Sequence, residues 1–497
     1  MLRNYSRLRL VSFRFMHLQI ALKILGILLM VFSITMVPPI IVSLIYDDGA
    51  MIAFADTFAL TLISGFVLWI LFLRHDAEMR IKDGFLITTM FYLLLGAVGA
   101  IPLIQESSIG LSWPNALFES FSGLTTTGST VLTQIDSLPE SVLFYRQQLQ
   151  WLGGMGIIVL AVAILPMLGI GGMQLYRAET PGPVKDSKLT PRIKQTALAL
   201  WSIYLGITVI CALAYWLAGM TLFDAICHSF STVAIGGFST HDASIGYFDS
   251  PLIESIAIFF MVLAGMNFGL HFFAFRERTI GHYLRDDEVQ FYLAILIATT
   301  IVVSGFLYHS AEYDGLQAIR YATFQVVSVF TTTGFATADF SEWPSMLPYL
   351  IFFGAFTGAC AGSTGGGMKV MRVMLIAKQG LREIHRLIHP NAIFPIKMNK
   401  RPVSNGVIEA VWGFFSVYVI LFLFMLLAMV ATGMDFLSAF SAVAAAINNL
   451  GPGLGSVAYH YSDISDSAKI ILCFAMILGR LEIFTLLVLF TPMFWRK

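Results

Sequence analysis

Four short polar stretches interrupt an otherwise apolar chain, and each has a glycine near its centre. They read "TTTGSTVL" from residue 125, "AIGGFSTHD" from 234, "TTTGFATAD" from 331 and "NNLGPGLGS" from 448. Glycine lets the backbone bring its carbonyl oxygens toward a common axis without a Cβ clash. Rings of carbonyl oxygens can replace the hydration shell of a monovalent cation. The chemistry that these stretches indicate is therefore cation coordination.

The residues expected to line such a site are the central glycine of each stretch and the two residues before it. Threonine and asparagine there would add side-chain oxygens, and isoleucine would supply a stiff flank. Four such loops could meet around one axis and form stacked rings of dipoles. The candidate cation-binding residues are Thr126, Thr127, Gly128, Ile235, Gly236, Gly237, Thr332, Thr333, Gly334, Asn449, Leu450 and Gly451.

A fifth stretch, "GACAGSTGGGMK" at 358–369, consists almost entirely of small residues and lies inside an apolar segment. So many small residues do not hold a straight helix, so we expect an intramembrane loop. A small-residue face for close helix packing is the alternative. A phosphate-binding loop is disfavoured because the stretch lacks the GK[ST] ending.

Arg480 lies near the middle of the last apolar segment, where ionisable side chains usually face a cavity or a partner. We expect it to face the pore; a structural ion pair, with Glu482 nearby in sequence, is the alternative. A fixed positive charge in a narrow passage repels a cation strongly. The sequence thus suggests one gate on the inner side of the four cation-binding loops. Its predicted residues are Gly358, Gly362, Gly365, Gly366, Gly367, Lys369 and Arg480.

The elements that must position these residues are membrane helices. The chain has 497 residues, of which 57% are hydrophobic and only 12% charged, which indicates a polytopic membrane protein. Apolar runs of about 20 residues or more, long enough to span a bilayer, occur at 20–46, 51–73, 83–104, 142–170, 195–219, 251–275, 289–309, 345–376, 406–433 and 467–492.

Four shorter apolar runs of about 10–14 residues precede the polar stretches and suit re-entrant helices. The unit of span, short helix, glycine-centred loop and span therefore occurs four times, after two extra N-terminal spans. The expected fold is all-α, and each short helix directs its negative C-terminal end at the axis. The expected boundaries are 1–80 for the extra spans, then 83–194, 195–287, 288–402, with the glycine-rich loop and a basic linker, and 403–497.

Basic residues cluster in alternate loops and at both termini, so these parts should be cytoplasmic. The basic segments Lys185–Lys194 and Lys378–Arg401 are candidate docking surfaces for a regulatory partner. Membrane orientation alone explains the same charges equally well. Acids on the outer loops would attract cations toward the pore mouth.

The motifs "FESFSGLTTTGSTVL", "AIGGFSTHDASIGYFDSP", "GACAGSTGGGMKV" and "NNLGPGLG" together resemble the Trk/Ktr/HKT superfamily of potassium transporters, most closely its bacterial TrkH/TrkG type. The resemblance covers nearly the whole chain. It implies a pseudo-fourfold channel-like fold, potassium as the transported ion, and a key filter glycine at Gly128, Gly237, Gly334 and Gly451. It also implies a homodimer in the bacterial inner membrane, surrounded by lipid, with a cytoplasmic TrkA-type nucleotide-binding subunit and no nucleic acid.

The sequence also has to be compared with what two other functions would require. An intramembrane enzyme using His228 or His271 would need an acid, a base and a nucleophile brought together, and no such set is visible in the sequence. The second alternative is an ion-coupled secondary transporter of potassium, driven by protons or sodium. Two inverted halves with a midplane site would favour this alternative. Four repeats in one direction favour the channel-like design, but passive and coupled flux both remain open.

Overall fold

The computed structural model describes residues 19–73, 81–159 and 193–495. Within these ranges the chain is helical apart from loops and one two-residue hairpin, β1 (Lys397–Met398) with β2 (Arg401–Pro402). Six of the described helices are long and apolar enough to span a membrane, or eight if each of two bent pairs is one span. The all-α, multi-spanning fold expected from the sequence is confirmed. Residues 185–192 of the basic segment Lys185–Lys194, and most of the basic N-terminus, lie outside the described residues.

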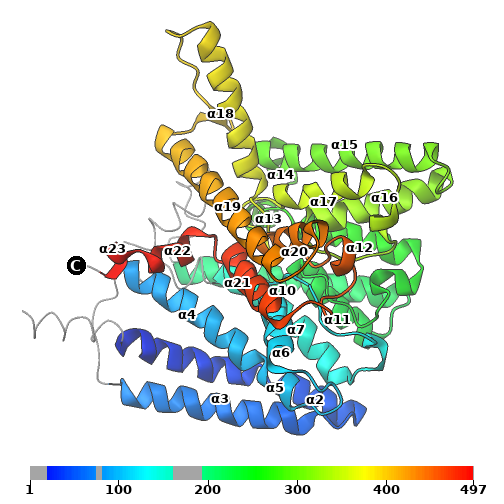
Figure 1. Cartoon of the computed structure of the whole chain (residues 1–497), viewed down its shortest axis with the longest axis vertical. Coiled ribbons are helices and arrows are strands. Elements are labelled where there is room, and N and C mark those ends of the chain that lie inside the picture. Colours follow the sequence, from blue (N-terminus) through cyan, green and yellow to red (C-terminus); the bar gives the residue numbers. More distant parts are fainter. Residues whose placement is uncertain (1–18, 74–80, 160–192, 496–497) are drawn as a thin grey trace, which may run out of the picture.

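The N-terminal part is a helical hairpin. Its first arm runs from Gln19 to Tyr46 and ends in α2 (Val37–Tyr46), and its second arm is α3 (Met51–Leu71). The two arms touch at glycines: a Cβ atom built on Gly26 would lie 2.7 Å from the carbonyl oxygen of Gly65. Small residues at a crossing let helices approach closely in a bilayer. These helices and α4 lie along one side of the molecule (Figure 1).

After this hairpin, the order of a long helix, a short helix, a loop and a second helical segment occurs four times. The exact repeat boundaries remain a prediction. The elements are α4 (Ile81–Gly99), α5 (Ile101–Gln105), α6 (Trp113–Leu124) and α7 (Glu140–Val159); α10 (Ile193–Leu217), α11 (Leu222–Ala234), α12 (Pro251–Ala264), α13 (Phe268–Glu277) and α14 (Gly281–Arg285); α15 (Asp287–His309), α16 (Gly315–Phe330), α17 (Leu347–Thr357) and α18 (Val370–Ile388); α19 (Asn405–Ala431), α20 (Phe436–Asn448), α21 (Asp466–Arg480), α22 (Phe484–Phe490) and α23 (Pro492–Trp495).

Within the described residues, the second helical segment is broken in the second, third and fourth units. The break between α17 and α18 falls at 358–369, as the small residues predicted. The segments predicted as spans at 251–275 and 467–492 are not straight helices, because α12 and α13 are bent by 97° and α21 and α22 by 115°. In the first bend, the freed carbonyl of Gly265 accepts a hydrogen bond from the Cys360 amide at 2.9 Å. The glycine-rich loop therefore satisfies backbone that a straight helix would have satisfied itself.

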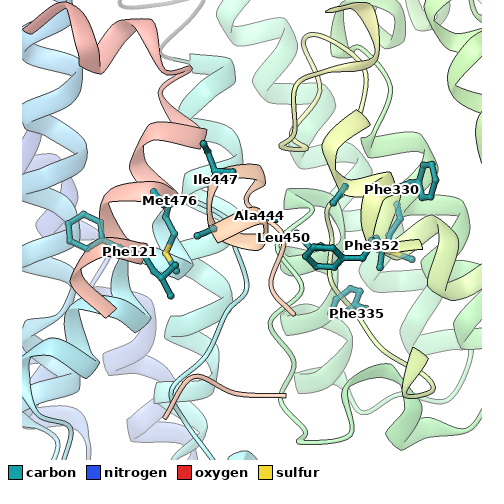
Figure 2. Close-up of a cluster of buried hydrophobic side chains, with 14 of the residues drawn as sticks. Phe121, Phe330, Phe335, Phe352, Ala444, Ile447, Leu450 and Met476 are labelled. Carbon is teal, nitrogen blue, oxygen red and sulfur yellow. The ribbon is translucent and has the colours of Figure 1, made fainter. Parts of the chain in front are cut away.

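The four short helices α6, α11, α16 and α20 are buried inside the bundle, although each is too short to span a membrane. Their apolar faces pack against the surrounding long helices, and this packing fixes where each short helix ends. Figure 2 shows this core, with α20 in the middle and neighbouring helices on both sides; the labelled side chains are Phe121, Phe330, Phe335, Phe352, Ala444, Ile447, Leu450 and Met476.

Candidate functional site

Each short helix ends in the same backbone turn. The first of the three candidate residues in every loop has a left-handed conformation, with φ of 55° at Thr126, 56° at Ile235, 67° at Thr332 and 52° at Asn449. The next residue donates its amide hydrogen five residues back into the helix, at 2.8 Å in all four loops. These are the bonds of the Schellman termination. The four loops thus begin from the same geometry although their sequences differ.

Three of these left-handed residues are β-branched, namely Thr126, Ile235 and Thr332. A β-branched side chain disfavours positive φ, so each turn stores strain that the surrounding packing must hold. All three side chains are at most 1% exposed. Strained backbone of this kind concentrates at functional sites, and here it directs the chain toward the central glycine.

The central glycines contact one another in sequence around a ring. A Cβ atom on Gly128 would lie 2.0 Å from the carbonyl oxygen of Gly236 in the next loop. A Cβ atom on Gly237 would in turn lie 2.0 Å from the carbonyl oxygen of Thr333. Real Cβ atoms do not approach oxygen so closely, so these two loops accept only glycine at this position without moving.

The third and fourth loops close the ring. A Cβ atom on Gly334 would lie 2.8 Å from Cδ of Pro452 and 3.1 Å from the amide nitrogen of Gly451. A Cβ atom on Gly451 would lie 2.7 Å from the carbonyl oxygen of Gly128, where the circuit began. The four predicted glycines are therefore neighbours around one axis. Gly451 differs from the others because its φ is not positive.

The threonine, isoleucine, asparagine and leucine side chains of the four loops are buried, whereas Gly128, Gly237 and Gly334 are partly exposed. Two of the candidate carbonyl oxygens already have protein donors. Gln150 Nε2 donates to Gly236 at 2.6 Å, and Ser129 Oγ donates to Gly451 at 2.8 Å. These hydrogen bonds hold the second and fourth loops in place. They also distinguish those two oxygens from the other candidate carbonyl oxygens.

The glycine-rich loop at 358–369 packs against the ends of three short helices. Its Gly366 amide donates to Thr332 Oγ1 at 2.7 Å, its Gly367 amide donates to the Asn448 carbonyl at 3.0 Å, and Thr364 Oγ1 donates to the Val233 carbonyl at 3.0 Å. The approach is tight, since a Cβ atom on Gly366 would lie 2.0 Å from that Asn448 oxygen. The loop therefore lies directly beside the turns that lead into the glycine ring.

Arg480 connects this loop to the first unit. Its Nη1 donates to the carbonyl of Thr364 at 3.0 Å and its Nη2 donates to the carbonyl of Gly153 in α7 at 2.7 Å, and the residue is 3% exposed. An ion pair with Glu482 is not formed: Glu482 pairs with Arg372 instead. Arg480 and the glycine-rich loop, which the sequence grouped into one gate, are in contact.

The other residues of the predicted gate lie within the same loop or at its end. Lys369 Nζ donates to the carbonyl of Gly365. Gly358 and Gly367 face each other, with only 2.6 Å between the Cα atom of Gly358 and a Cβ atom built on Gly367. Gly362 is exposed and lies beside Asn267 in the bend between α12 and α13. The predicted gate residues are thus brought together.

Sequence reasoning missed Glu288, at the start of α15. Its Oε1 accepts the amide hydrogens of Ala361 at 2.7 Å and Met371 at 3.1 Å, so one carboxylate holds both sides of the glycine-rich loop. The residue is 3% exposed. A carboxylate at the end of an apolar segment is a signal in the sequence, but its target lies more than 70 residues away in the chain.

A polar cluster lies around His241, in the chain segment that follows Gly237. His241 Nδ1 is 2.5 Å from Asp136 Oδ1, its Nε2 is 3.4 Å from Asp224 Oδ1, and its ring stacks on Tyr247. Partial burial favours the neutral imidazole, but the Asp224 and Asp136 carboxylates outweigh burial and raise the pKa of His241. Burial also favours the neutral form of Asp136 and by itself would raise the pKa of that carboxyl. The hydrogen bond with His241 outweighs burial, so the pKa of Asp136 is lowered.

His228 and His271, the histidines that an intramembrane enzyme would use, have structural partners on both ring nitrogens. His228 Nδ1 bonds the carbonyl of Asp224 at 2.9 Å and its Nε2 bonds Ser239 Oγ at 2.9 Å. His271 bonds the Tyr283 hydroxyl at 2.7 Å and the Leu263 carbonyl at 3.0 Å. A carbonyl only accepts, so in each ring the nitrogen facing it carries the proton.

Comparison with known proteins agrees with this architecture. Residues 50–497 match the family model TrkH, described as a cation transport protein. The chain belongs to the TrkH family. It is 57% identical to the "Trk system potassium uptake protein TrkH" of Halomonas elongata over 97% of this chain and 100% of that protein. It is 42% identical to the "Trk system potassium uptake protein TrkG" of Escherichia coli over 97% of this chain and 99% of that protein.

A solved TrkH-family structure has the same fold. The crystal structure of the potassium transporter TrkH from Vibrio parahaemolyticus aligns with a TM-score of 0.89 at 51% identity, covering 96% of this chain and 100% of that one. The resemblance inferred from the motifs is therefore confirmed. The relatives are named as transport proteins, and this TrkH-family chain is a multi-pass membrane transport protein rather than an enzyme.

Proposed function

We propose that this TrkH-family protein takes up potassium across the bacterial inner membrane through a selectivity filter made by the four glycine-centred loops. The observation that carries the proposal is the closed ring of Gly128, Gly237, Gly334 and Gly451, in which each glycine contacts the next loop. Carbonyl oxygens around such a ring can replace the water shell of potassium. Relatives more than 50% identical over nearly all of the chain are named as potassium uptake proteins, which supports the choice of ion.

The same proposal assigns the gate to the glycine-rich loop and Arg480. The loop bonds to the ends of three short helices, and Arg480 bonds the loop to α7. A cation that leaves the filter inward would meet a buried positive charge. Opening then requires the loop to move and Arg480 to exchange its two carbonyl partners for water or counter-charges.

We further propose that the protein is a homodimer with both termini in the cytoplasm, regulated there by a TrkA-type nucleotide-binding subunit. Helix α18 extends away from the other helices (Figure 1), and its outer part carries exposed apolar side chains, with Leu387 83% exposed. Arg382 and Arg386 lie on the same helix, so this surface is both basic and apolar. Because α18 continues directly from the glycine-rich loop, a partner bound to it can move the loop.

The test is rubidium uptake into proteoliposomes that contain the purified protein, with sodium as competitor and with or without an imposed proton gradient. Gly128→Ser adds a side chain against the Gly236 carbonyl, so sodium should compete more strongly with rubidium. Gly219→Ser is the matched control, because Gly219 also has positive φ, at 107°, but has no neighbouring atom within 4 Å of a Cβ.

Equal sodium competition in wild type and Gly128→Ser would refute the filter assignment. The proton-gradient arm separates channel-like flux from the alternative, ion-coupled secondary transport. Rubidium uptake driven by the rubidium gradient alone supports the channel-like proposal. Uptake that requires a proton or sodium gradient supports coupling.

A further inference from the structure

In three of the four short helices, a side chain at the same position anchors the chain segment that follows the filter glycine. Glu119, His228 and Gln325 each lie nine residues before the central glycine of their loop. His228 bonds Ser239 Oγ at 2.9 Å, and Gln325 Nε2 donates to the Ala338 carbonyl at 2.7 Å. In the fourth unit this position is an alanine, and the adjacent Ser441 bonds both the amide and the carbonyl of the outgoing loop instead. The anchor is thus a common feature of the four loops.

In the first unit the anchor is a charge. Glu119 accepts the amide hydrogen of Val131 at 3.0 Å and the hydroxyl of Thr130 at 3.0 Å, both in the segment after Gly128. Its other partner is Arg146 of α7, whose Nε lies 2.8 Å from Glu119 Oε1. The side chains of Glu119 and Arg146 are 0% and 1% exposed. A pair so deeply buried is retained only where good geometry and further hydrogen bonds compensate the loss of water.

Arg146 also contacts the second loop. Its Nη1 donates to the carbonyl of Ser239 at 3.2 Å, its Nη2 donates to Thr130 Oγ1 at 3.2 Å, and the guanidinium lies 4.2 Å from the ring centre of Phe238. Thr130 and Ser239 are each two residues beyond their filter glycine. One rigid, planar group therefore bonds equivalent points of two adjacent loops. Lysine could not reproduce this, because it has a single ammonium centre instead of a fork of donors.

We propose that the Glu119–Arg146 pair is a positioning element that sets the spacing between the first and second filter loops and thereby the discrimination of potassium against sodium. This inference rests on the proposed filter. A smaller ion is favoured when the surrounding oxygens can move closer together, and a fixed bridge between adjacent loops opposes that contraction. The pair does not touch the ion; it acts through Thr130 and Ser239.

The experiment compares sodium competition against rubidium uptake in proteoliposomes for wild type, Arg146→Lys, Glu119→Gln and Gly128→Ser. Arg146→Lys keeps the charge beside Glu119 but loses the simultaneous contacts to Thr130 and Ser239. We expect sodium to compete about fivefold more strongly in Arg146→Lys, with rubidium uptake retained, a shift of about 1 kcal/mol in relative ion preference. Glu119→Gln should shift competition in the same direction.

Glu254→Gln is the matched control. Glu254 is 2% exposed and pairs with Arg320 at 2.7 Å, but this pair contacts none of the four loops at the filter glycines. A purely structural role for the Glu119–Arg146 pair would lower the melting temperature and protein yield of Arg146→Lys and Glu119→Gln without changing sodium competition. Arg146→Lys carries the test if Glu119→Gln does not fold.

The outcomes distinguish this inference from the filter proposal. If Gly128→Ser changes sodium competition and well-folded Arg146→Lys does not, the bridge does not set selectivity and the inference is overturned. If Gly128→Ser also leaves competition unchanged, the filter assignment fails and the inference fails with it. A change in Gly128→Ser and Arg146→Lys, with none in Glu254→Gln, supports both.

Discussion

Replacing Arg480 by methionine should open the pore in the absence of any partner. Methionine keeps an unbranched side chain that fills irregular space, but it removes the charge and the donors to Thr364 and Gly153. Of these two contacts, the one to the Thr364 carbonyl, at 3.0 Å, connects Arg480 to the glycine-rich loop. The contact to Gly153, at 2.7 Å, holds Arg480 itself in place.

The size of the effect follows from these contacts. A hydrogen bond from a charged group contributes about 1.5–3 kcal/mol. If the bond to Thr364 exists only in the closed state, its loss shifts the equilibrium toward the open state by about 10- to 150-fold, since about 1.4 kcal/mol corresponds to a factor of ten. Removing the positive charge lowers the barrier to a cation further. The range of about 10- to 150-fold is therefore a lower bound on the increase in flux.

The assay is rubidium uptake by purified protein in proteoliposomes without a regulatory partner. Uptake should rise at least about tenfold in Arg480→Met and should rise also in Arg480→Ala, while sodium competition stays at the wild-type value. Arg320→Met removes another arginine that is not bonded to the loop, and should leave uptake unchanged. Wild-type uptake by folded Arg480→Met would refute the reasoning, because the arginine would then not limit flux.

Three further predictions concern the glycine-rich loop, helix α18 and the cluster around His241. Deleting several residues between Gly362 and Gly367 should raise rubidium uptake without partner, and unchanged uptake would place the gate elsewhere. Reversing the charges of Arg382 and Arg386 should reduce co-purification with the proposed nucleotide-binding subunit, whereas undiminished co-purification would leave membrane orientation as their role. His241 has a raised pKa, so the stability it contributes is present below its ordinary pKa of 6.5 and is lost as pH rises through the raised value. The melting temperature should therefore fall across that range in wild type, and a fall of the same size in His241→Gln would exclude His241 as its cause.

Much of the fold follows from local properties of the sequence. The length and polarity of the apolar runs identified the membrane segments and the four short helices, because spanning a bilayer requires a minimum helix length. The small residues at 358–369 predicted the break between α17 and α18, because such residues do not stabilise a helix. The key glycine of each loop was assigned from the resemblance to potassium transporters, because the second and fourth stretches each contain more than one glycine.

The bends at 265–267 and 481–483 were not predicted from the sequence. The residues "GMN" and "LEI" at these points do not by themselves break a helix, since the backbone is bent where other segments supply hydrogen bonds. Gly265 finds its donor in Cys360, almost a hundred residues away. A bend that depends on such a partner leaves little trace in the local pattern.

The partners of the buried charges were decided only by the tertiary structure. The sequence showed that Arg480 is embedded in an apolar segment, but its nearest acid in the chain, Glu482, pairs with Arg372 instead, and Arg480 bonds two carbonyls. The sequence also contained Glu119 and Arg146 without showing that they meet. Hydrogen bonds depend on the distance between atoms, and folding brings together groups that are far apart along the chain. The closure of four glycine loops into one ring is decided in the same way, by the packing of whole helices rather than by the residues of any one loop.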